Sequence, residues 1–220
     1  MYKHAWRTLR TFLLGSCLFL LPPDQAAAAD RFLTSPSLLL IDQSGSVKSE
    51  QLRNISSGVA AALRRFGPQH KLQVMTWGTR PQAVEWHTLA SLDQLAREVW
   101  HAQPRKEKTN TGAALAQLST DHSFDCLNVL LLQHEVPDDA GRYQASVQTI
   151  LDRGGRITVL VFGPTGRSIE YIVHELQYDT AYRPIGSYPG EYRVAALTAT
   201  TFIAGLTQLQ QPPRCQLLGM

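Results

Sequence analysis

Ser37-Leu38-Leu39-Leu40-Ile41-Asp42-Gln43-Ser44-Gly45-Ser46 is the stretch that decides the fold. The apolar run Leu38 to Ile41 has no polar alternation, which is typical of a strand buried on both faces of a parallel sheet. The run ends abruptly in one carboxylate and two hydroxyls, those of Asp42, Ser44 and Ser46. Open α/β sheets bind ligands just beyond the carboxyl ends of their strands, and hard divalent cations prefer oxygen ligands. The stretch therefore predicts a buried strand that delivers oxygen donors to a binding rim.

Strand and helix patterns alternate along the rest of the chain. Apolar runs predict strands at 37–42, 72–77, 127–132 and 157–162, with a short antiparallel edge strand at 83–86 and another edge strand near 182–185. Helical spacing predicts helices at 49–66, from 91 with Ser91 and Gln94 as a capping box, at 112–118, from 138 with Asp138 and Asp139 at its N-terminus, around 169–176 and at 194–209. This order predicts an α/β fold with a doubly wound, mostly parallel central sheet flanked by helices.

The N-terminus has the pattern of a secretory signal peptide. A basic segment at 1–10 precedes the apolar run Thr11 to Leu21, and Ala26 to Ala29 provide small residues for cleavage. A membrane-spanning helix needs about 20 apolar residues, and this run is much shorter. We therefore expect a signal peptide at 1–29, no transmembrane segment after its removal, and a single domain at 30–220. The protein is expected to be exported, to the bacterial periplasm or beyond the cell.

Charge and motifs exclude several function classes. Beyond residue 29 the positive and negative charges nearly balance, so nothing indicates a nucleic-acid-binding patch. The sequence has no Gly-x-Ser-x-Gly elbow, no His-Glu-x-x-His and no phosphate-binding Gly-x-x-x-x-Gly-Lys-Ser/Thr loop. We therefore expect a protein that is not an enzyme, with a metal-dependent hydrolase as a less favoured alternative.

Two motifs together resemble the von Willebrand factor type A (vWA) family. Asp42-x-Ser44-x-Ser46 after a hydrophobic strand resembles the family's metal-ion-dependent adhesion site, and Thr109-Asn110-Thr111-Gly112-Ala113-Ala114-Leu115 resembles its Thr-x-Thr-Gly-x-Ala-Leu element. The resemblance covers residues 35–209. It implies a site for Mg²⁺ or Mn²⁺ at Asp42, Ser44, Ser46 and Thr109, where an acidic residue of a protein partner completes the coordination. The implied role is adhesion, or assembly of other envelope proteins.

The third loop of the site departs from the family pattern. The resemblance places His134 where the family has an Asp, and Glu135 where it has a glycine. Four arrangements remain open. In the first, the four oxygen-bearing residues hold Mg²⁺ weakly; in the second, His134 joins them and the site favours a transition metal. In the third, the Glu135 side chain turns toward the site. In the fourth, the cluster holds no metal and ties the loops together, and the domain is an interaction scaffold.

Two cysteines, Cys126 and Cys215, remain after removal of the predicted signal peptide. In an oxidising compartment such a pair is a candidate disulfide, which would attach the C-terminal tail to the central sheet. The alternative is two free thiols.

Overall fold

The computed structural model describes residues 37–44, 49–101, 108–121, 126–163 and 166–211. The predicted signal peptide at 1–29, Ser46 and Cys215 lie outside these residues, so the expectations about them remain predictions. No helix in the described part of the chain is long and apolar enough to cross a membrane.

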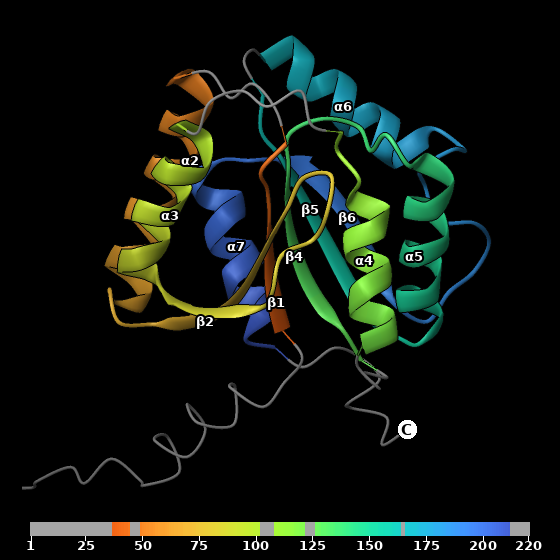
Figure 1. The fold of residues 1–220 in the computed structure, drawn as a ribbon, viewed down its shortest axis with the longest axis horizontal. Coiled ribbons are helices and arrows are strands. Elements are labelled where there is room, and N and C mark those ends of the chain that lie inside the picture. Colours follow the sequence, from red (N-terminus) through yellow and green to blue (C-terminus); the bar gives the residue numbers. More distant parts are fainter. Residues whose placement is uncertain (1–36, 45–48, 102–107, 122–125, 164–165, 212–220) are drawn as a thin grey trace, which may run out of the picture. The chain divides into compact units, whose positions relative to one another are not determined.

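The described strands form one sheet in the order β3-β2-β1-β4-β5-β6 (Figure 1). β3 pairs antiparallel with β2 at one edge, and the other neighbours are parallel. The predicted fold class is therefore confirmed. The strands are β1 (Ser37–Asp42), β2 (Lys71–Trp77), β3 (Glu85–Thr88), β4 (Asn128–Gln133), β5 (Arg156–Val161) and β6 (Glu191–Ala196).

Helices cover both faces of the sheet (Figure 1). One face carries α2 (Ser49–Phe66), α3 (Leu89–His101) and α7 (Ala199–Leu209), and the other carries α4 (Thr111–Asp121), α5 (Ala140–Asp152) and α6 (Gly166–Tyr178). In β1, Leu39 and Ile41 belong to the first core, whereas Leu38 and Leu40 belong to the second. A central strand covered on both sides has no solvent-facing positions, which explains its unbroken apolar run.

Two predictions near the C-terminus are wrong. No strand forms at 182–185, and the residues that were expected to begin the last helix form the end of β6, which pairs with β5. The helix α7 begins only at Ala199, because Thr198 and Thr201 form a capping box. Thr201 N donates to Thr198 Oγ1 at 3.1 Å, and Thr198 N donates to Thr201 Oγ1 at 2.8 Å.

The start of α3 also differs from the prediction. The edge strand lies at 85–88 instead of 83–86, and the helix begins at Leu89. Thr88 and Ser91 exchange the capping hydrogen bonds: Ser91 N donates to Thr88 Oγ1 at 3.1 Å, and Thr88 N donates to Ser91 Oγ at 2.9 Å. Ser91 therefore takes the third helical position of the capping box and not the N-cap position.

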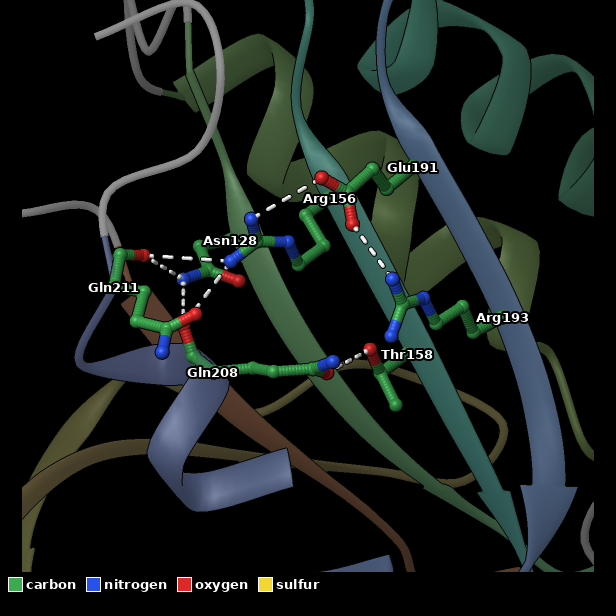
Figure 2. Close-up of polar contacts among 7 residues, drawn as sticks. All are labelled: Asn128, Arg156, Thr158, Glu191, Arg193, Gln208 and Gln211. Atoms are coloured by element: carbon green, nitrogen blue, oxygen red, sulfur yellow. Dashed lines mark hydrogen bonds and ion pairs between the residues drawn. The ribbon is translucent and has the colours of Figure 1, made fainter. Parts of the chain in front are cut away.

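A polar cluster holds the C-terminal end of α7 against the first residues of β4 and β5 (Figure 2). Asn128 Nδ2 donates to the backbone oxygens of Gln208 at 2.9 Å and Gln211 at 3.1 Å. Arg156 Nη1 donates to the same two oxygens at 3.2 and 3.4 Å. The last carbonyls of a helix have no partner within the helix. At the Gln208 oxygen, in the last turn of α7, these side-chain donors add to the hydrogen bond from Gln211 N at 3.0 Å. The cluster lies at the end of the sheet opposite to Asp42.

Candidate metal centre

The candidate centre lies where β1 and β4 end. These strands are parallel neighbours, so their carboxyl ends meet at one edge of the sheet. Asp42 is the last residue of β1, and His134 directly follows β4. Thr109 lies in the loop just before α4, which starts at Thr111. The loop after β1 is fixed by a hydrogen bond from Gln43 N to the backbone oxygen of Trp77 at 2.6 Å.

Three of the predicted oxygen-bearing residues come together. Ser44 Oγ lies 2.6 Å from Thr109 Oγ1, although 65 residues separate them in the sequence. Ser44 also donates to Asp42 Oδ1, through its hydroxyl and through its backbone N at 2.8 Å. Asp42 is 0% exposed, and Ser44 and Thr109 are each 1% exposed. The structure thus brings the first two predicted loops into one buried cluster.

Burial dominates the environment of the Asp42 carboxyl. Burial raises the pKa of Asp42 from 3.8 to about 7, although hydrogen bonds from Ser44 and from the backbone N of His134 oppose the rise. The negative charge of Glu135 raises the pKa further. A cation at this rim would stabilise the ionised carboxylate that burial disfavours.

The backbone N and the ring of His134 contact different parts of the site. Its backbone N donates to Asp42 Oδ2 at 3.1 Å. Its ring is 4% exposed, packs on Phe162 with 5.3 Å between ring centroids, and accepts a hydrogen bond at Nε2 from Gln51 Nε2 at 2.5 Å. Burial lowers the pKa of His134 to about 4, so the imidazole is neutral. The predicted register places His134 at the rim, but the contacts of its ring lie with Gln51, Phe162 and Glu135.

Two acids that follow the third loop support the second loop. Asp138 Oδ2 accepts from Thr109 N at 2.7 Å, and Asp138 N donates to the backbone oxygen of Thr109 at 3.0 Å. Asp139 accepts from Gly112 N at 3.0 Å and Ala113 N at 2.8 Å. Asp139 is the N-cap residue of α5, but its side chain makes no capping bond there. Both acids lie at the N-terminus of α5, as predicted, but their carboxylates bond to Thr109 and to the start of α4.

Gln51 is a residue of the site that sequence reasoning missed. It is 0% exposed and lies one turn before Ile55 on the apolar stripe of α2. A polar residue on the buried face of a helix needs a partner, and here that partner is His134. The sequence signal for this role was the position of Gln51, a polar residue, within the apolar stripe of the helix.

The oxygen donors of the cluster meet some of the coordination requirements of a small hard cation. Adjacent ligands of an octahedral Mg²⁺ at 2.0–2.1 Å lie about 2.9 Å apart, close to the 2.6 Å between the hydroxyls of Ser44 and Thr109. Asp42 supplies a carboxylate beside them, but no second buried carboxylate accompanies it in the described cluster. The described residues contain no group of three or more His, Cys, Asp or Glu side chains that could hold a metal. Any cation here would therefore depend on hydroxyl oxygens and water in addition to the Asp42 carboxylate.

No protein-family model matches the sequence, and no curated protein matches it with significant similarity. Solved structures do resemble the fold. Manganese-loaded TRAP protein from Plasmodium vivax is 14% identical, with a TM-score of 0.52 over 80% of this chain and 73% of that one. BatB from Bacteroides thetaiotaomicron is 12% identical, with a TM-score of 0.46 over 80% of this chain and 98% of that one.

A third similar structure is the von Willebrand factor type A protein from Catenulispora acidiphila. It is 12% identical, with a TM-score of 0.42 over 80% of this chain, and the chain spans only 42% of its length. At such identities the likeness concerns the fold alone. In the described part of the chain, the sheet order, the antiparallel edge strand β3 and the likeness to the TRAP structure describe a doubly wound α/β fold.

Proposed function

We propose that this chain is an exported bacterial vWA-like domain that binds a protein partner through a divalent cation at the rim formed by Asp42, Ser44, Ser46 and Thr109. The observation that carries the proposal is the 2.6 Å approach of the Ser44 and Thr109 hydroxyls beside the Asp42 carboxylate. The same three side chains carry the resemblance to the metal-ion-dependent adhesion site. The cation would be Mg²⁺ or Mn²⁺, because the donors are hydroxyl and carboxylate oxygens.

Each residue has a distinct part in this proposal. The hydroxyls of Ser44 and Thr109 would bind the cation directly, and Ser46 would add a third hydroxyl. Asp42 would hold Ser44 in place and balance part of the charge, with the backbone N of His134 fixing its second oxygen. When bound, the cation would supply a Lewis-acid position for a carboxylate oxygen of the partner. The role would be adhesion or the assembly of envelope proteins.

A metal-free interaction scaffold is the second candidate. It is favoured by the fact that both oxygens of Asp42 already accept hydrogen bonds, from Ser44 and from His134 N. A cluster satisfied in this way holds the two loops together without a cation. The hydrolase alternative has less support. Ser44 Oγ bonds to Asp42 and Thr109, and the His134 ring bonds to Gln51, so the described contacts do not form a Ser-His-Asp relay.

Calorimetric titration of the purified protein with Mg²⁺ and Mn²⁺ separates the two candidates. Thr109→Val keeps the shape of the buried side chain and removes the hydroxyl, whereas Thr109→Ser keeps the hydroxyl. We expect Thr109→Val and Asp42→Ala to abolish binding and Thr109→Ser to retain it. A wild-type protein that binds neither cation at millimolar concentration contradicts the proposal and favours the scaffold.

A further inference from the structure

The cation site has a deficit of negative charge in its buried part. Asp42 is the carboxylate among the clustered donors, and the neutral His134 occupies the position where the resemblance implies a second acid. A site that takes a divalent cation is strengthened by further anionic groups nearby. If the proposed function holds, a residue near the cation site must supply this second negative charge.

Glu135 is fixed beside the site through its backbone. Its carbonyl oxygen accepts from Gln133 Nε2 at 2.5 Å, and Gln133 Oε1 accepts from Thr111 Oγ1 at 3.1 Å. Gln133 is 0% exposed, so this connection between the third loop and the Thr109 to Thr111 segment is internal. The carboxylate of Glu135 is solvent-accessible, with its side chain 55% exposed, yet it lies close enough to Asp42 for its charge to act on that carboxyl.

The His134 ring directs a donor toward Glu135. Gln51 Nε2 donates to His134 Nε2, and a neutral imidazole that accepts at one nitrogen carries its proton on the other. Nδ1 is buried and has no hydrogen-bond partner among the described residues. Glu135 Oε1 lies 3.5 Å from it, slightly beyond hydrogen-bond length. A small movement of the flexible Glu135 side chain would satisfy this buried N–H, which is costly to leave unpaired.

We propose that Glu135 supplies the second negative charge of the cation site and that His134 is a positioning residue, which holds the Glu135 carboxylate at the rim through Nδ1–H. The two departures from the family pattern then compensate each other: the acid is lost at residue 134 and regained at residue 135. Glu135 acts on the cation through water or by direct contact, and the His134 ring is not a ligand.

Titration of the full-length protein with Mn²⁺ alone tests the role of Glu135. Glu135→Gln keeps the shape of the side chain and removes its charge, and Glu50→Gln makes the same change at an exposed residue in the first turn of α2. We expect Glu135→Gln to weaken Mn²⁺ binding about tenfold or more, and Glu50→Gln to change it less than about twofold. Equal effects of the two variants, or wild-type affinity in Glu135→Gln, would overturn the inference.

The outcomes keep this inference separate from the proposed function. Loss of binding in Asp42→Ala with unchanged binding in Glu135→Gln retains the cation site and rejects the role of Glu135. A wild-type protein that binds no Mn²⁺ rejects both.

The positioning role of His134 has its own readout, the ¹⁵N NMR spectrum of the imidazole. We expect a neutral ring protonated at Nδ1, and a shift of the Nδ1 resonance in Glu135→Gln. A ring protonated at Nε2, or an Nδ1 resonance that Glu135→Gln does not move, would reject the positioning role.

Discussion

Arg156 Nη2 lies 3.3 Å from Glu191 Oε1, which joins the first residues of two parallel neighbours, β5 and β6 (Figure 2). The side chains of Arg156 and Glu191 are 9% and 19% exposed, so solvent screens the pair only in part. Glu191 Oε2 also lies 3.4 Å from Arg193, whose side chain is 59% exposed. One carboxylate thus has a buried and an exposed cationic partner, which provides a matched comparison.

Arg156→Met should destabilise the domain by about 2–4 kcal/mol, because it removes a largely buried ion pair and one of the two side-chain donors to the backbone oxygens of Gln208 and Gln211, where the Asn128 donor remains. Arg193→Met removes only the exposed partner of Glu191 and should cost less than about 1 kcal/mol. Urea denaturation of both variants measures the difference. Similar losses of stability in the two variants would show that the buried contacts contribute no more than the surface pair.

Gly112→Ala should destabilise the contact between α4 and α5. A Cβ at residue 112 would lie 2.3 Å from Tyr143 N and 2.6 Å from the carbonyl carbon of Arg142, so the helices would have to separate. We expect a loss of about 1–3 kcal/mol and weaker Mn²⁺ binding, since Gly112 follows Thr109 closely in the chain. Gly141→Ala is the control, because a Cβ there meets nothing within 4 Å and should stabilise α5 by about 0.4–1 kcal/mol. Thermal unfolding and titration check both effects, and unchanged stability in Gly112→Ala would contradict the close packing.

The predictable parts of this structure are those that local patterns determine. Unbroken apolar runs identified the central strands, and the resemblance of two motifs to the vWA family indicated that Asp42, Ser44 and Thr109 would lie together. The edge of the sheet was less predictable. β6 is only half-buried, so its sequence lacks an apolar run, and its last residues were assigned to the following helix.

Side-chain directions at the rim were also beyond the reach of sequence patterns. The motif register placed His134 correctly after β4, but its ring direction depends on Gln51, which is 83 residues away. The roles of Asp138 and Asp139 likewise depend on the loop before α4, which the chain order does not place beside them.

His134→Asp should raise the affinity for Mg²⁺ by about tenfold, because the backbone N of residue 134 lies beside Asp42 and a short carboxylate there adds a negative charge at the rim. This added charge should outweigh the loss of the Nδ1–H that holds Glu135. The same change should lower the stability of the metal-free protein by about 1–3 kcal/mol, since it removes the ring that packs on Phe162 and accepts a hydrogen bond from Gln51. His134→Asn is the matched control: it loses the same contacts without gaining charge and should not gain affinity. Titration with Mg²⁺ and urea denaturation measure the two effects. Unchanged affinity in His134→Asp would mean that a carboxylate at residue 134 does not reach the cation.

The chain that follows α7 starts close enough to Cys126 for the predicted disulfide between Cys126 and Cys215. Asn128, two residues after the buried Cys126, holds the backbone oxygen of Gln211. Cys215 is four residues farther along the chain, and four extended residues span at most about 14 Å.

We expect the exported protein to carry this bond, and Cys215→Ser to lower its stability by about 2–4 kcal/mol, because the cross-link restricts the unfolded chain. Mass spectrometry of peptides from unreduced protein identifies the bond, and thermal unfolding with and without reductant measures its contribution. Cys215→Ser should unfold at the same temperature in both conditions, since it lacks the bond that reductant removes. Two thiols that react with an alkylating agent in unreduced, denatured wild-type protein would contradict the pairing.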